Sequence, residues 1–136
     1  MSFDKFGTLT VQTFTAGGAL PISNVNIHIY GVSEENSEIS YSVITDRSGM
    51  TEKISLPAPS KKASLTPSSH EISYGLYNVD VSREDYYTKK FSNVAIFENV
   101  DTILPVNMVP KAINNKNVTY PHGNLDILIE ENKYLE

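Results

Sequence analysis

The sequence contains no cysteine and no tryptophan among its 136 residues. The absence of cysteine excludes disulfide frameworks, zinc sites with thiolate ligands and cysteine nucleophiles. Basic residues are also few, since 11 Lys and Arg stand against 16 Asp and Glu and give a formal net charge of -5. A negative field repels phosphate backbones, so we expect no nucleic-acid partner.

Long apolar runs are absent as well. No stretch comes near the roughly 18 consecutive apolar residues that a membrane-spanning helix needs. The opening segment, MSFDKFGTLTV, has neither the apolar run nor the small-residue cleavage site of a secretory signal. We therefore expect no membrane partner, and a chain that is made in the cytoplasm without being secreted.

The chain has instead an apolar pattern of period two. This alternation occurs in residues 7–14, 25–30, 38–45 and 74–82. Successive side chains of a strand point to opposite faces, so the pattern predicts half-buried strands of an antiparallel sheet. Among the aromatic residues, we expect Tyr77 and Phe91 to lie in the core. Two further runs, 91–97 and 102–109, flank residues 98–101. Pro105 in the second run predicts an edge strand or a bulge.

Turn residues divide these runs. Residues 16–21 contain two Gly and one Pro and end the first run. Residues 45–49, TDRSG, suit a turn, which we interpret as a hairpin linking 38–45 to 51–56. The pattern as a whole predicts an all-β fold, a seven-stranded antiparallel Greek-key β-sandwich of prealbumin-like or immunoglobulin-like type with a C-terminal extension.

Two segments fall outside this pattern. Residues 57–70 hold three prolines and little apolar content, which predicts a long surface loop. After residue 110 the composition changes to a polar, asparagine-rich stretch. We accordingly divide the chain into a sandwich domain, 1–110, and a linker with a strand-like tail, 111–136.

Apolar residues return in the tail, where Leu125, Ile127 and Ile129 occupy every second position. Such a segment can return to its own sheet or add a strand to the sheet of a neighbouring chain. Both alternatives are open. We treat these three residues as a candidate contact with other protein subunits.

The sequence offers little chemistry. His28, His70 and His122 lie in distant segments without a partner at ligand spacing, so no metal site is predicted. Glycine-rich phosphate-binding motifs and the nucleophile elbow of hydrolases are absent. The adjacent carboxylates Glu34 and Glu35 do not face each other across a cleft as glycosidase carboxylates do. We expect no catalytic residue and no cofactor.

One segment combines aromatic and basic residues. Tyr86 and Tyr87 are followed by Lys89 and Lys90, with Arg83 nearby. If the two tyrosines lie in a strand, one of their rings points outward. The sequence therefore predicts a candidate glycan-binding or protein-binding patch here, formed by Tyr86, Tyr87, Lys89 and Lys90.

A family resemblance rests first on three segments, GTLTV at 7–11, ALPISNVNI at 19–27 and TDRSGMT at 45–51. They resemble the opening strands and hairpin of carboxypeptidase regulatory-like domains, which are transthyretin-like or prealbumin-like sandwiches. Further segments are TDRSGMTEKISLPAP, YGLYNVDV, FSNVAIF and MVP. These are more specifically similar to the N-terminal module of clostridial spore cortex-lytic enzyme precursors and related peptidoglycan-associated proteins. The resemblance covers roughly residues 7–110.

The resemblance implies a seven-stranded, non-catalytic sandwich that accompanies or positions other activities. The hydroxyisourate hydrolases of the transthyretin-like group end in Tyr-Arg-Gly-Ser. This chain ends in Lys133-Tyr134-Leu135-Glu136 instead, so we do not expect that enzymatic activity.

Two functions follow as expectations. The first is a structural or adaptor subunit of a larger protein assembly, such as a phage tail or phage-tail-like particle. Such a particle is assembled in the cytoplasm and released by lysis, which would agree with the missing secretory signal. The alternative is a peptidoglycan-binding or glycan-binding accessory module of a spore or cell-wall system.

Overall fold

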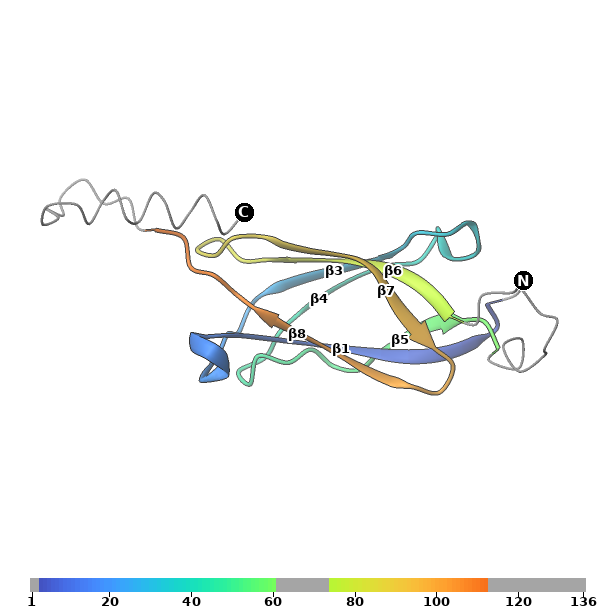
Figure 1. Ribbon diagram of the computed structural model, residues 1–136, viewed down its shortest axis with the longest axis horizontal. Helices are drawn as coiled ribbons and strands as arrows, with labels where there is room; N and C mark the ends of the chain where they lie inside the picture. Colours follow the sequence, from blue (N-terminus) through green and yellow to red (C-terminus); the bar gives the residue numbers. More distant parts are fainter. Residues whose placement is uncertain (1–2, 61–73, 113–136) are drawn as a thin grey trace, which may run out of the picture.

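The computed structural model describes residues 3–60 and 74–112, which form two sheets packed face to face (Figure 1). The strands are β1 (Lys5–Thr15), β2 (Leu20–Pro21), β3 (Asn26–Gly31), β4 (Ser40–Ile44), β5 (Ile54–Ala58), β6 (Tyr74–Ser82), β7 (Lys89–Phe97) and β8 (Asp101–Asn107). Two short 3-10 turns, η1 (Ala16–Gly18) and η2 (Glu34–Asn36), follow β1 and β3. Within these ranges the fold is all-β, and no helix has the length and apolarity to cross a membrane.

The first sheet has the order β4-β3-β6-β7 and is antiparallel throughout. In its two central strands, Ile27 lies opposite Val81 and Ile29 opposite Val79. All four side chains are buried, while their sequence neighbours are not. The alternation read from the sequence is therefore confirmed for β3 and β6, because every second side chain enters the core.

The second sheet is built around β1. Strand β5 pairs with the first half of β1, β2 pairs with its last two residues, and β8 runs along its other side. The β1–β8 pair is parallel, so the prediction of a purely antiparallel sandwich is wrong. The reason lies in the turn after β7, where Asn99 N–H donates to Phe6 O at 2.9 Å and Thr8 N–H donates to Val100 O at 3.0 Å. Because of these two bonds, β8 begins beside the start of β1 and runs in the same direction.

The core lies between the two sheets. Its fully or nearly fully buried hydrophobic residues are Leu9, Val11, Ile22, Val25, Ile27, Ile29, Ile54, Leu56, Ala58, Tyr77, Val79, Val81, Ile96, Val106 and Met108. Every strand of both sheets except the edge strands β2 and β4 contributes at least one of them. The prediction that Tyr77 belongs to the core is confirmed, whereas Phe91 is only partly buried and packs against the core from outside it. Pro105 lies in the edge strand β8 as expected.

The strand count and one connection differ from the sequence prediction. The described part contains eight strands rather than seven, because Leu20–Pro21 pairs with the end of β1 after the glycines of η1. Residues 45–49 do form a turn, but not a hairpin. Thr45 N–H donates to Val25 O on the side of β3, whereas Thr51 N–H donates to Val11 O in β1. The turn thus carries the chain from one sheet to the other. The Greek-key connectivity stays a prediction.

Buried threonine hydroxyls fix this crossing. The Oγ1 atoms of Thr13 and Thr45 both donate to the carbonyl oxygen of Ile22, at 2.8 and 2.9 Å. Thr45 Oγ1 also accepts the N–H of Val25 at 3.0 Å, and Thr51 Oγ1 accepts a β1 N–H at 2.9 Å. All three threonines are almost completely buried. Since a buried polar group without a partner is costly, these bonds hold both passages of the chain between the sheets at one corner.

We expect Gly49→Ala to destabilise this corner strongly. Gly49 has a φ of 74°, and an added Cβ would collide with the carbonyl oxygen of Thr13. Gly17→Ala is the matched control, because Gly17 also has a positive φ of 65° but no neighbour within 4 Å of the added atom. Urea denaturation should show a loss of about 1 kcal/mol for Gly17→Ala and about 3 kcal/mol for Gly49→Ala. Equal losses would contradict the close packing of the turn on β1.

A second link between the sheets is the hydroxyl of Tyr77. It leaves β6, crosses the core and donates to the carbonyl oxygen of Pro57 in β5 at 2.6 Å. Burial raises the pKa of Tyr77 from 10.0 to about 12. The neutral hydroxyl is therefore the form that the folded state prefers.

The free energy of unfolding is expected to fall as the pH rises from 10.0 to about 12. In this window the unfolded chain releases the Tyr77 proton while the folded chain retains it, which contributes a loss on the order of 2 kcal/mol. Tyr77→Phe should remove this part of the pH dependence and cost about 1–2 kcal/mol at neutral pH. Urea denaturation across the window measures both effects. An unchanged slope in the Phe variant would contradict the assignment.

Candidate functional site

The aromatic and basic patch predicted from the sequence lies where β6 passes into β7. Tyr86 and Tyr87 belong to the connection, and Lys89 and Lys90 begin β7. Both tyrosines are half-buried, so the prediction that strand alternation exposes only one of them is wrong, because neither lies in a strand of the sheet. Tyr86 packs partly against the core, and Lys90 is exposed. The patch thus presents two partly accessible rings beside the exposed side chain of Lys90.

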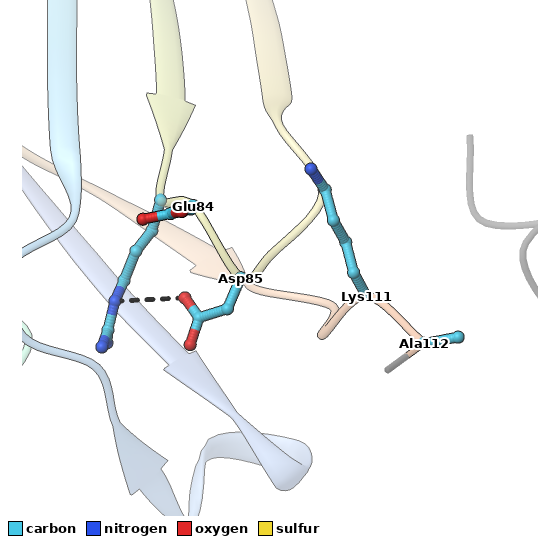
Figure 2. Close-up of a pocket in the computed structure, with 5 residues that line it drawn as sticks. Glu84, Asp85, Lys111 and Ala112 are labelled. Carbon is cyan, nitrogen blue, oxygen red and sulfur yellow. Dashed lines mark ion pairs between the residues drawn. The ribbon is translucent and has the colours of Figure 1, made fainter. Parts of the chain in front are cut away.

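Arg83 organises the connection. Its Nη1 donates to the carbonyl oxygen of Ser23 at 3.1 Å, and its Nε lies 3.3 Å from Asp85 Oδ1 (Figure 2, dashed line). The guanidinium carbon lies 5.6 Å from the centroid of the Tyr86 ring, within the range of a cation–π contact. Arg83 therefore fixes the ring of Tyr86 and joins the connection to the chain that enters β3.

The connection is also hydrogen-bonded to the chain that follows β8. Tyr87 N–H donates to Val109 O at 2.9 Å, and Lys111 N–H donates to Asp85 O at 3.0 Å. Between these bonds, Tyr86 and Pro110 form an isolated β-bridge. Nothing in the sequence signalled this pairing, because it joins segments that are distant along the chain and carry no shared motif.

A shallow depression of about 480 Å³ opens beside this pairing, and Figure 2 shows its lining residues. They are Arg83, Glu84, Asp85, Lys111 and Ala112. Two basic and two acidic side chains meet there, so the depression has no excess charge of either sign. Together with the two tyrosine rings, it offers donors, acceptors and apolar area, which are features of surfaces that bind proteins or sugars.

The other residues considered from the sequence do not join this site. His28 lies on the outer face of the first sheet, where its Nε2 is 2.9 Å from Ser40 Oγ and its ring centroid is 5.0 Å from that of Tyr30. Glu34 and Glu35 lie in η2, away from the patch. Over residues 3–60 and 74–112, no group of three or more acidic or histidine side chains is placed to hold a metal ion.

Three sets of predicted residues lie outside the described part of the chain. They are the tail residues Leu125, Ile127 and Ile129, the histidines His70 and His122, and most of the predicted loop 57–70. Of that loop, residues 57–60 are described, and the first two of them end β5.

No family model and no curated protein matches the chain, so the resemblance to carboxypeptidase regulatory-like domains stays a prediction. Among solved structures, the TIE protein of Bacillus anthracis is similar with a TM-score of 0.51 and 13% identity. The match covers 78% of this chain and 17% of that one, so this chain spans about a sixth of that protein chain. At this identity the likeness shows the β-sandwich fold alone.

Two other solved structures are similar with lower scores. One is a chain from a type II cohesin–X-dockerin complex of Acetivibrio cellulolyticus, a C-terminal interface mutant, with a TM-score of 0.46 and 18% identity over 91% of this chain and 70% of that one. The other is 3-chlorocatechol 1,2-dioxygenase from Rhodococcus opacus 1CP, with a TM-score of 0.47 and 13% identity over 81% of this chain and 63% of that one.

Proposed function

We propose that the protein is a non-catalytic structural subunit of a larger protein assembly. The observation that carries this proposal is the pairing of residues 109–111 with the connection between β6 and β7. It fixes residues 109–111, near the end of the described part of the chain, directly beside the aromatic and basic patch. A contact surface beside the start of the C-terminal segment would suit a subunit that binds its neighbours through both.

The character of the surface supports a binding role over an enzymatic one. The carboxylates of the depression in Figure 2 are those of Glu84 and Asp85, both exposed, and Asp85 is already paired with Arg83. Exposed carboxylates lack the burial that tunes a catalytic acid or base. A phage tail or phage-tail-like particle, assembled in the cytoplasm and released by lysis, is the setting we propose for the subunit.

The native size of the protein in a lysate of its source tests this proposal. We expect gradient sedimentation with mass-spectrometric detection to find the chain in a particle far larger than its own 15.1 kDa. The proteins that migrate with it would identify the assembly. A chain that sediments only near 15.1 kDa under all conditions would contradict the proposal.

Binding to peptidoglycan is the second candidate, favoured by the half-buried ring of Tyr87 close to the exposed Lys90. Aromatic rings at the surface can stack on sugars. We expect Tyr87→Ala to reduce co-sedimentation with purified cell walls severalfold. Tyr41→Ala is the control, because Tyr41 is 41% exposed and lies in β4, at the edge of the first sheet opposite β7. This variant should leave binding unchanged. A wild-type protein that stays in the supernatant would rule out this function.

A further inference from the structure

The edges of the two sheets differ in how they are protected against added strands. An edge strand has free backbone N–H and C=O groups and can pair with another chain unless proline, charge or a bulge prevents it. In the described part of the chain the edges are β4 and β7 in one sheet, and β2, β5 and β8 in the other. Four of these five carry such a protection.

The protections are easily identified. Strands β2, β5 and β8 each contain a proline. Strand β7 begins with two lysines and departs from regular pairing with β6 between Tyr77 and Val79. Asn93, in the bulged part of β7, has a φ of 60°. These edges are therefore poor acceptors for another strand.

Strand β4 carries none of these protections. Its sequence, Ser-Tyr-Ser-Val-Ile, has no charge, no proline and no glycine. Its pairing with β3 is regular over all five residues. Two of its side chains are exposed hydrophobics, Tyr41 at 41% and Ile44 at 58%.

The hydrogen bonds between β3 and β4 show which backbone N–H and C=O groups of β4 point away from β3. Beyond its two ends, Thr45 N–H donates to Val25 O and Gly31 N–H donates to Ile39 O. Bonded and non-bonded pairs alternate in an antiparallel ladder, so the odd-numbered residues of β4 bond to β3. The N–H and C=O groups of Ser40, Ser42 and Ile44 consequently face the open edge.

The interior beside this edge is also accessible. A shallow depression of about 530 Å³ lies between β4 and the chain that enters β5. It is lined by Ser42, Val43, Ile44, Asp46, Met50, Thr51 and Glu52. Val43 and Tyr41 lie opposite the buried Ile27 and Ile29, so they share the inner face of the sheet. An added strand with aliphatic side chains at every second position would cover this part of the core.

We propose that the β4 edge is the acceptor for residues 124–129 of a second copy of the chain. This inference rests on the proposed function and names the contact that would join the subunits. The donor segment, Asn-Leu-Asp-Ile-Leu-Ile, has aliphatic residues at 125, 127 and 129, the spacing that the inner face of β4 requires. Its six residues are enough to span the five residues of β4.

The place where the described chain ends agrees with this pairing. Ala112 lies next to the connection that follows β6. The last residue of β6, Ser82, pairs with Asn26 of β3, and Asn26 pairs with Ile44 on its other side. Ala112 and the end of β4 are therefore at the same end of the first sheet. Residues 113–123 can extend over roughly 35 Å, enough to reach an adjacent molecule. One chain then carries both a donor and an acceptor, a head-to-tail contact that builds rings or filaments.

Sedimentation velocity of the full chain over a range of concentrations tests the acceptor edge. We expect oligomers in the wild type and at least about tenfold weaker association in Ile44→Lys, which places a charge on the edge. Ile103→Lys is the matched control, because Ile103 in the edge strand β8 is also 58% exposed. Oligomers equally affected by both variants, or by neither, would overturn the assignment to β4 while leaving the proposed assembly function in place.

A cross-linking experiment tests the donor. The chain has no cysteine, so Ser42→Cys and Asp126→Cys can be introduced into separate full-length chains of different mass. We expect mild oxidation of the mixture to give the heterodimer, since facing strand residues lie within disulfide reach. No heterodimer in the mixture, with closure only within single chains that carry both substitutions, would show that the segment folds back on its own copy and overturn the proposal. Dimers formed by Ser42→Cys alone in preference to the mixture would equally overturn it, in favour of direct β4–β4 pairing.

Discussion

The carbonyl oxygen of Ile22, shared by the hydroxyls of Thr13 and Thr45, is the contact on which the rest of the architecture depends. The chain passes from the second sheet to the first just after Ile22 and returns through the turn that begins at Thr45. Both passages meet at this buried corner. The hydroxyls there have partners although they are buried, so the chain makes both passages without an unsatisfied group at this corner. Strand β4, which ends beside Thr45, lies at an edge of the first sheet.

The same end of the sandwich carries the features relevant to function. Arg83 donates to the carbonyl oxygen of Ser23, one residue beyond the shared carbonyl, and so joins the connection between β6 and β7 to the corner. The connection in turn pairs with residues 109–111, which fixes the point from which the C-terminal segment continues. The connection between β6 and β7, residues 109–111 and the end of β4 therefore lie at one end of the sandwich (Figure 1).

The sequence allowed the strands to be predicted because their burial follows a local rule. The buried residues Ile27, Ile29, Val79 and Val81 alternate with residues that are not buried. Such an alternation is typical of a strand with one buried face. Sheet membership was not predictable in this way. Whether the turn after Thr45 forms a hairpin or a crossing depends on hydrogen bonds to Val25 and Val11, which are long-range contacts. The parallel pairing of β8 with β1 was not predicted either, because it also depends on long-range contacts.

The candidate site was predicted in composition but not in geometry. Tyr86 and Tyr87 were singled out for their neighbours in sequence, whereas their half-buried positions come from Arg83 and from the pairing with Val109 and Pro110. The absence of proline, glycine and charge in β4 is visible in the sequence. That β4 lies at the edge of its sheet could not be inferred before the strand order was known. Protection of an edge has meaning only once the edges are identified.

The most direct test of strand addition at β4 is backbone hydrogen exchange at Ser42 and Ile44, whose N–H groups face the open edge. Exchange is followed in the full chain at a concentration where it is assembled and again after dilution. Pairing of β4 with a strand from a second copy predicts slow exchange of both amides in the assembled state and fast exchange in the dilute state, while Tyr41 and Val43, bonded to β3, stay protected in both. Exchange of Ser42 and Ile44 at the same rate in the two states would contradict it.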